Sequence, residues 1–245
     1  MALKVTTFSS KGRATRIFSY KTNRIHHLQS DNQLNVFLLL EWNDNVINIE
    51  ENVELNDLEE NLDNIEELRL DKFTDKETGK IYQLHTNFLI TILDENDEEE
   101  QIALSVKSVS ELERNIVIEK MEIEKRYWKS KGIKFFVITN KEIDKQVINN
   151  IKWSREAGAG EATKRKGDKQ TFKENQKLEE LLYYFLQKNK NEILNKALKL
   201  FDFEKGLKEG TALYLFRYLI WNKEISIDMK SKINLNFKTE DIIKF

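Results

Sequence analysis

The sequence predicts an α/β domain with a mixed sheet, followed by a smaller α+β domain. Two segments, 82–92 and 101–107, alternate apolar and polar residues as antiparallel strands do. A nearly continuous apolar segment, 133–138, follows a helical pattern over 110–131 and precedes a final helix that ends near Trp153. This order is typical of a buried strand that pairs in parallel after a helical crossover. A sheet with both kinds of pairing is therefore expected, with flanking helices.

A polar stretch divides the chain into these two parts. Three of the eight glycines fall within residues 157–169, where apolar side chains are almost absent. Such a composition predicts a break between domains. We expect one domain over residues 1–155, a basic flexible linker over 156–170, and a second domain over 171–245. The linker either lies along DNA or serves as a solvated tether.

The first elements of the larger domain are an extended segment and an enclosed helix. Residues 16–28 are expected to be extended or to form a hairpin, with a turn at 22–23. A helix follows over 30–42, and a short strand is expected over 46–55. The helix carries five consecutive apolar residues, 36–40, which occupy most of its circumference. Other elements should therefore enclose this helix.

The two alternating strands form the centre of the predicted sheet. An acidic helix is expected before them, over 58–70, and the acidic run 94–100 is expected to be the loop that joins them. If this loop is centred on Asp97, antiparallel pairing sets Asn87 opposite Lys107. Their side chains would then share one face, about 5 Å apart at Cβ.

The second domain has the element order of a winged helix. The expected elements are helices at 172–188, 191–201 and 211–221, followed by a hairpin of the segments 225–229 and 233–237. A module of this kind usually binds DNA through its third helix. Here Arg217 is the single basic residue of that helix, which makes it too apolar for a typical groove-reading helix. Protein docking is therefore favoured over DNA reading for this domain.

Composition and charge narrow the classes of function. The chain has no cysteine, which excludes disulfide scaffolds, cysteine–zinc sites and thiol nucleophiles. The longest apolar run is too short to span a bilayer and no secretory signal is recognised, so an intracellular protein without membrane contact is expected. The net charge of −2 hides opposed patches, because residues 1–24 hold six bases and no acid, whereas residues 25–68 hold twelve acids and no base. The basic segment either contacts DNA phosphates or folds back on its own acidic domain.

Four polar residues converge in the predicted arrangement: Gln33, Asn87, Ser105 and Lys107. A metal-dependent phosphodiesterase uses such a layout, in which acidic oxygens on a helix and a strand hold a divalent ion and a lysine orients the attacking water. The spacing matches but the charges do not, since Mg²⁺ prefers anionic oxygen ligands to neutral amides. An ordinary explanation also exists, because Gln33 can close a capping box on Ser30 and the strand residues can face solvent.

The chain resembles the TnsA family, the endonuclease subunits of heteromeric cut-and-paste transposases of the Tn7 type. The motifs that carry the resemblance lie at residues 12–31, 37–42, 46–50, 86–89, 105–107, 118–128 and 138–143. They include Thr86-Asn-Phe-Leu89 and Ser105-Val-Lys107. The resemblance covers most of residues 10–155, while the C-terminal region is similar in element order alone.

The resemblance implies a fold, a reaction and a set of partners. The first domain would have a restriction-endonuclease-like fold, and the second would be winged-helix-like. The family cuts double-stranded DNA at the 5′ ends of a mobile element, and a TnsB-type recombinase cuts and joins the 3′ ends. A TnsC-type AAA+ ATPase contacts the C-terminal part. The expected location is the bacterial cytoplasm, with nucleoid association during transposition.

The resemblance also assigns roles within the site. Gln33, Asn87 and Lys107 occupy the catalytic positions, and Gln33, Asn87 and Ser105 occupy those that bind Mg²⁺ or Mn²⁺. The family has Glu at the first of these positions and Asp at the second, so both carboxylates are replaced here by amides. Little or no cleavage is therefore expected, whether the change was introduced deliberately or arose naturally. The alternatives are a non-catalytic DNA-binding assembly factor that recruits the recombinase and the ATPase, and a stand-alone restriction or repair nuclease.

Cations near the N-terminus are the expected DNA contacts. Histidines at these positions more commonly pack at a domain edge. The acids of the helix over 110–131 are expected to be surface or salt-bridged positions. The expected phosphate contacts are Arg13, Arg16, Lys21, Arg24, His26 and His27.

Overall fold

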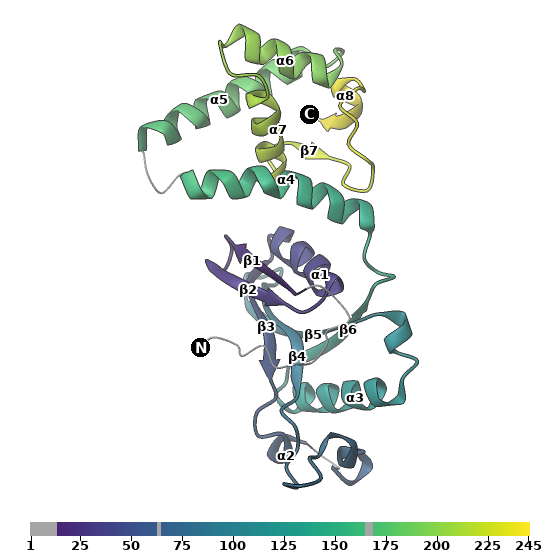
Figure 1. The fold of residues 1–245 in the computed structure, drawn as a ribbon. Helices are drawn as coiled ribbons and strands as arrows, with labels where there is room; N and C mark the ends of the chain where they lie inside the picture. The colour runs from purple at the N-terminus through teal and green to yellow at the C-terminus, as the bar shows by residue number, and fades with distance from the viewer. Residues whose placement is uncertain (1–13, 63–64, 165–168) are drawn as a thin grey trace. The chain divides into compact units, whose positions relative to one another are not determined.

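A computed structural model describes residues 14–62, 65–164 and 169–245 (Figure 1). Contacts divide the chain into two compact units, Met1–Ile143 and Asp144–Phe245. Each unit is described separately below. Arg13, one of the expected DNA contacts, lies outside the described residues.

The first unit is a mixed α/β domain, as the sequence predicts. Its elements in chain order are β1 (Thr15–Ser19), β2 (Arg24–Leu28), α1 (Asp31–Trp42), β3 (Val46–Glu54), α2 (Leu58–Asn61), β4 (His85–Leu93), β5 (Glu99–Lys107), α3 (Asn115–Ser130) and β6 (Lys134–Thr139). Strands β3, β4, β5 and β6 form one sheet in that order, and β1 pairs with β2 in a separate ribbon. The pairs β3–β4 and β4–β5 are antiparallel, whereas β5–β6 is parallel. The mixed sheet is confirmed.

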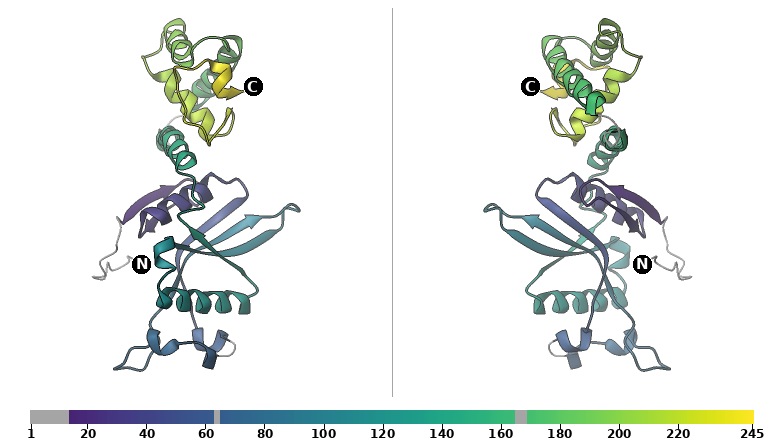
Figure 2. Two further views of the ribbon diagram at one scale, coloured as in Figure 1. Left: turned by 90° about the vertical axis from the view of Figure 1, so that its right-hand side faces the viewer. Right: turned by 90° about the vertical axis from the view of Figure 1, so that its left-hand side faces the viewer.

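Two helices cover the sheet from opposite sides (Figure 2). In α1, the side chains of Val36, Phe37 and Leu38 are at most 1% exposed, so the expectation of an enclosed helix is confirmed. In α3, Tyr127 and Trp128 pack into a buried apolar cluster with sheet residues and with the segment after β3. The sheet therefore carries a helix on each side. The prediction of a buried strand over 133–138 is wrong, because β6 lies at the edge of the sheet, where none of its residues is buried and Phe136 is 51% exposed.

The predicted acidic helix over 58–70 is wrong. The segment instead forms α2 and two short 3₁₀ turns, Ile65–Glu67 and Leu70–Phe73. Leu68 and Leu70 both pack against the same buried cluster. Residues two apart point to different sides of an α-helix, so one continuous helix could not bury both.

The predicted register of the β4–β5 hairpin is also wrong. Phe88 pairs with Leu104, so the register does not set Asn87 opposite Lys107. The loop closes on Asp94, whose carboxylate accepts hydrogen bonds from the N–H groups of Asn96 and Glu98. This turn centres the loop one residue earlier than predicted, which shifts the pairing by two residues and keeps side chains on the predicted faces.

The second unit is mainly helical. Its elements are α4 (Lys145–Lys164), α5 (Lys169–Lys188), α6 (Leu194–Glu204), α7 (Thr211–Trp221), β7 (Ser226–Ile227), α8 (Thr239–Ile242) and β8 (Ile243–Lys244). The three helices expected in this region are present as α5, α6 and α7. Most of α7 is buried, including Leu215, Phe216 and Leu219.

Helix α4 extends into the stretch where a flexible linker was predicted. The backbone is helical to Lys164, and residues 165–168 of the predicted linker lie outside the described part of the chain. Tyr214 on α7 donates its hydroxyl to the carbonyl of Ala157, 2.9 Å away. Gly158 lies so close to the Trp221 ring that a Cβ there would be 2.2 Å from Cδ1. Small residues at these positions therefore let two helices approach closely, where their polarity and glycine content suggested a tether.

The predicted C-terminal hairpin is absent from the described residues. Strand β7 pairs with β8 at the chain end, and the segment 233–237 is not a strand. Backbone carbonyls of this region have other partners. Asn150 on α4 donates to the carbonyls of Met229 and Ser231 at 2.9 Å each, and the first N–H groups of α6 donate to those of Leu235 and Phe237. These bonds replace the ladder that a wing would require.

Candidate active site and its surroundings

Three of the four predicted site residues meet at one oxygen. Asn87 Oδ1 accepts hydrogen bonds from the Val106 N–H at 2.7 Å, from Lys107 Nζ at 3.3 Å and from Ser105 Oγ at 3.4 Å. The side chains come from the adjacent ends of β4 and β5. The convergence predicted from the sequence is therefore present for these three residues.

The local backbone explains why Asn87 occupies this place. The regular ladder between β4 and β5 ends at the Phe88–Leu104 pair. On the other side of β4, Asn52 has a left-handed backbone, with φ of 54°, at the point opposite Asn87 where no pair forms between Glu51–Phe88 and Val53–Thr86. The Asn87 side chain then supplies the acceptor for an N–H of β5 that the strand backbone does not meet.

Lys107 lies in a low-dielectric environment. Burial lowers the pKa of its ammonium, while the negative charge of Glu124 acts in the opposite direction. The positive charge of Lys120 lowers this pKa further. A lysine with a lowered pKa beside a strand end is suited to orienting or deprotonating a nearby group.

Glu124 is a buried acid on α3, where acids are expected to be at the surface or salt-bridged. Its side chain is 0% exposed, and Oε2 accepts a 3.0 Å hydrogen bond from Thr86 Oγ1. Lys120 Nζ lies 3.4 Å from Oε1, and Trp128 Nε1 donates to the Thr86 hydroxyl at 2.8 Å. The helical spacing could have revealed this position, since Glu124 is three and four residues before the buried Tyr127 and Trp128.

Gln33 makes its described hydrogen bonds within its own helix terminus. Its N–H donates to Ser30 Oγ at 3.2 Å, and its Oε1 accepts from the Gln29 N–H at 2.8 Å. No hydrogen bond among the described residues joins Gln33 to Asn87 or Lys107. The helix-capping explanation thus describes its contacts, with the Gln29 N–H as donor where the capping box uses that of Ser30.

The residues present do not fit a divalent metal ion. Within the described part of the chain, no group of three or more His, Asp or Glu side chains is arranged to hold one. The Asn87 oxygen already receives three donors, one of which is an ammonium. Mg²⁺ needs hard anionic oxygens, and an amide oxygen beside a cation supplies none.

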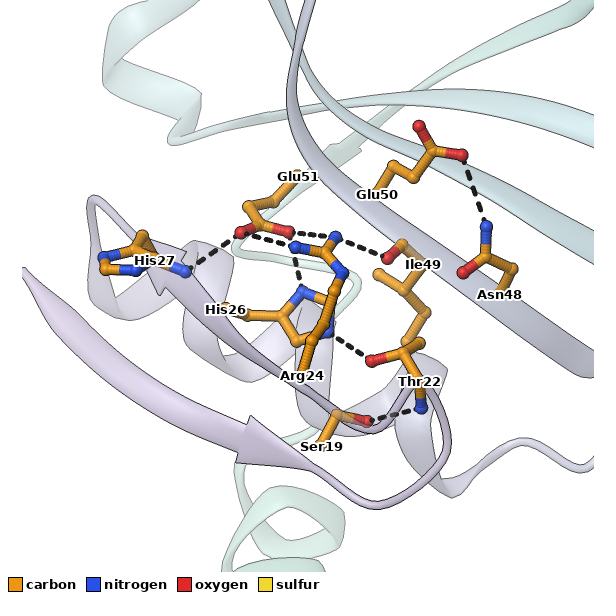
Figure 3. A network of polar contacts seen from close by, with 9 residues as sticks. All are labelled: Ser19, Thr22, Arg24, His26, His27, Asn48, Ile49, Glu50 and Glu51. Atoms are coloured by element: carbon orange, nitrogen blue, oxygen red, sulfur yellow. Dashed lines mark hydrogen bonds and ion pairs between the residues drawn. The ribbon is translucent and has the colours of Figure 1, made fainter. Parts of the chain in front are cut away.

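A second polar network surrounds Glu51 on β3 (Figure 3). Its carboxylate accepts hydrogen bonds from Arg24 Nη2 at 2.5 Å, from His26 Nδ1 at 2.7 Å and from the His27 N–H at 3.1 Å. The other ring nitrogen of His26 lies 2.7 Å from Thr22 Oγ1. This network ties the β1–β2 ribbon to the central sheet.

Hydrogen bonding determines the charge state of Glu51. Burial of the carboxylate raises its pKa, but hydrogen bonds from His26 and Arg24 lower it by more, and the pKa falls to about 2. Glu51 is therefore ionised at neutral pH and balances the charge of the Arg24 guanidinium.

The network separates the expected DNA contacts into two groups. The ring of His26 is 0% exposed, as in the packed-histidine alternative, and Arg24 is bonded to Glu51. Lys21 donates to the backbone carbonyls of Asn43 and Val46. These three side chains therefore contact their own domain, as expected if the basic segment folds back on it. Arg16 and His27 lie on the other face of the ribbon.

Most of the chain matches models of known protein families. Residues 43–140 match the family model described as TnsA-like endonuclease N terminal, and residues 142–229 match the one described as TnsA endonuclease C terminal. The chain belongs to the TnsA family. The mixed sheet with its flanking helices agrees with the restriction-endonuclease-like fold of TnsA. The two matched segments meet close to the division between the structural units.

One relative is the Transposon Tn7 transposition protein TnsA of Escherichia coli. It is 37% identical over 153 residues, a match that covers 62% of this chain and 54% of that protein. The chain thus matches about half the length of this TnsA. Within residues 14–62, 65–164 and 169–245, no helix is long and apolar enough to cross a membrane.

Proposed function

We propose that this TnsA-family chain is a transposase endonuclease subunit whose cleavage site is silent in the present form. It would hold double-stranded DNA at the ends of a mobile element and assemble with a TnsB-type recombinase and a TnsC-type ATPase. The observation that carries the proposal is the Asn87 cluster, in which an amide accepts a hydrogen bond from Lys107 at 3.3 Å. The meeting of these side chains at adjacent strand ends supports the assignment of a nuclease site, and the neutral acceptor supports its loss of cleavage.

The missing charge accounts for the loss of cleavage. Phosphodiester hydrolysis at such a site depends on a metal ion that activates water and offsets negative charge on the phosphate. Gln33 and Asn87 are neutral amides, so neither supplies an anionic oxygen. Lys107 remains, but a cation alone cannot substitute for the metal ligands. The chain as written is therefore proposed to bind DNA without cutting it.

Restoring the acids tests this proposal directly. The double variant Gln33→Glu, Asn87→Asp is expected to bind Mg²⁺ or Mn²⁺ in calorimetry and to nick DNA at element ends when the recombinase is present. Adding Lys107→Ala to it should remove nicking while leaving a measurable metal affinity. Metal-dependent nicking by the parent chain itself would contradict the proposal of a silent site.

A non-catalytic assembly role is the second candidate, and the second unit favours it. Helix α7 has the place of a groove-reading helix, but it is packed against α4 and its Arg217 is engaged there. The Arg217 guanidinium donates to the Trp153 carbonyl and to Glu156. On α6, in contrast, Phe203 is 84% exposed and Leu200 is 42% exposed. An exposed apolar pair suits a protein partner better than a DNA groove.

The two candidates differ in the expected behaviour of the restored double variant. A subunit that has lost its carboxylates should regain metal binding, whereas a scaffold whose site has drifted further should not. Phe203→Ser should reduce co-purification with the ATPase in either case. An unchanged yield of the complex would remove α6 from the docking surface.

A further inference from the structure

The β1–β2 hairpin is a separate two-stranded ribbon with chemically different faces. Its ten strand residues form five antiparallel pairs, and no acid occurs between residues 15 and 28. Arg16 pairs with His27, and Phe18 pairs with Ile25. Because side chains alternate along a strand, these four residues share one face, with paired Cβ atoms about 5 Å apart.

The opposite face anchors the ribbon to the first unit. His26 and Leu28 are buried there, and the His26 ring lies 4.8 Å from the Phe37 ring of α1. Glu51 binds both His26 and Arg24, as Figure 3 shows. The ribbon is therefore held at several points before any ligand arrives, which reduces the entropy cost of binding through its other face.

The outer face remains accessible and is basic and apolar. Ile25 is 53% exposed and Phe18 is 36% exposed, and Arg16 is also exposed. The Phe18 ring packs edge-on against Tyr20, with 5.0 Å between ring centroids. Cations on the inner side are engaged by Glu51 and by backbone carbonyls, so the charge directed outward comes from Arg16.

A two-stranded antiparallel ribbon has the dimensions to enter the major groove of DNA. Arginine forms paired hydrogen bonds with guanine there, and apolar side chains contact the thymine methyl group. The absence of acids on the ribbon removes repulsion by the phosphates on either side of the groove.

We propose that the outer face of the β1–β2 ribbon reads DNA sequence from the major groove. Arg16 and His27 contact base edges, and Phe18 and Ile25 pack against thymine methyl groups. This inference rests on the proposed function to the extent that the chain handles DNA. It adds a base-reading surface that is distant in sequence from the Asn87 cluster.

Selection from random DNA provides the test. The full chain is used to select the duplexes that it binds from a library with a randomised central segment. Fluorescence anisotropy then measures the affinity of the chain for the selected duplex and for a scrambled duplex of equal composition. The parent chain is expected to prefer the selected duplex. Arg16→Ala should weaken binding to that duplex by about 5- to 150-fold and should affect the scrambled duplex much less.

An exposed arginine elsewhere in the same unit supplies the matched control. Arg69 is bonded to Asp71 on the surface, and Arg69→Ala should leave the preference unchanged. If Arg16→Ala lowers the melting temperature, Ile25→Ser on the same face is measured in its place, with the same expected loss of preference.

The outcomes distinguish a failure of groove reading by the ribbon from a failure of the proposed function. Equal losses of affinity for both duplexes, or no loss, would overturn groove reading while leaving a DNA-binding subunit. A parent chain that binds DNA without sequence preference would do the same. A parent chain that binds neither duplex would overturn the ribbon and contradict the proposed function as well.

Discussion

Two polar clusters of the first unit are each centred on one hydrogen-bond acceptor, and the two acceptors differ in charge. In each, one side chain collects three kinds of donor. Glu51 accepts from a guanidinium, an imidazole and a backbone N–H. Asn87 accepts from an ammonium, a hydroxyl and a backbone N–H. The number of hydrogen bonds is similar, but the acceptor is an anion in the first cluster and a neutral amide in the second.

This difference shows what a carboxylate contributes beyond hydrogen bonding. The pKa of Glu51 is held at about 2, so its charge balances that of the Arg24 guanidinium. At the second cluster, burial lowers the pKa of Lys107, and the opposing effect comes from Glu124 on another element. The first cluster is therefore suited to stabilising the fold, whereas the second has no anionic acceptor for the Lys107 ammonium at Asn87.

Glu51→Gln should produce the largest effect. The variant leaves the buried His26 and the Arg24 guanidinium without an anionic partner, and we expect the free energy of unfolding to fall by about 3 kcal/mol. Urea unfolding measures the change. The control is Glu50→Gln on the same strand, an exposed acid bonded to Asn48, which should cost less than about 0.5 kcal/mol. Equal effects of the two variants would show that Glu51 is not a special anchor.

The same cluster should lose its contribution in acid. The pKa of Glu51 falls from an ordinary 4.5 to about 2 on folding, so its stabilisation is complete above pH 4.5 and is lost as the pH falls towards 2. The difference in unfolding free energy between the parent and Glu51→Gln should therefore be constant near neutral pH and shrink through this window. A difference that persists unchanged at pH 2 would assign the stabilisation to something other than the Glu51 charge.

Asn87→Asp should make the second cluster resemble the first. A carboxylate beside Lys107 favours the ammonium form, so the pKa of the lysine should rise by at least about one unit. Nuclear magnetic resonance of isotopically labelled lysine follows this titration. Asn96→Asp in the β4–β5 loop makes the same chemical change away from Lys107 and should not move its pKa. Identical titrations in both variants would mean that position 87 does not act on the lysine.

Lys107→Met should have the smallest effect, and its pH dependence should lie between the folded pKa of Lys107 and the ordinary 10.5. Because the folded pKa of Lys107 is lowered, the unfolded chain binds more protons between that pKa and the ordinary value of 10.5. The stability of the parent relative to Lys107→Met should therefore increase as the pH rises through this range. The exposed Lys125→Met is the control and should show no such trend. A flat difference for Lys107→Met would place its ammonium in a solvated environment.

The larger elements of the first unit could be predicted because their signals are local. Alternation identified β4 and β5, and the apolar segment after a helix identified β6. The segment after β3 could not be predicted in the same way, since Leu68 and Leu70 are buried together by tertiary packing that overrides the local pattern. In the second unit, the glycines and polar residues of 157–169 predict a tether. The role of Gly158 depends on Trp221, a residue far along the chain whose ring lies against it.

The candidate site was predicted in part. Parity along the strands placed Asn87 and Lys107 on a common face, and this survived an error in register. The inward direction of Arg24 and His26 could not be predicted, because it depends on Glu51, an acid far along the chain. The ion pair of Glu124 with Lys120 agrees with the prediction, but its complete burial was not predicted because acids on a helix are usually solvated. Its spacing from Trp128 indicates the buried side.

The contact between Gly158 and Trp221 makes the residues that are tolerated at these two positions depend on each other. A Cβ at residue 158 would lie 2.2 Å from the indole, so no other amino acid fits while the tryptophan remains. A smaller residue at 221 would remove that restriction, and a helix-favouring residue at 158 would then be tolerated. Positions 158 and 221 should therefore covary among relatives of this chain, and their covariation would report how closely α4 and α7 approach.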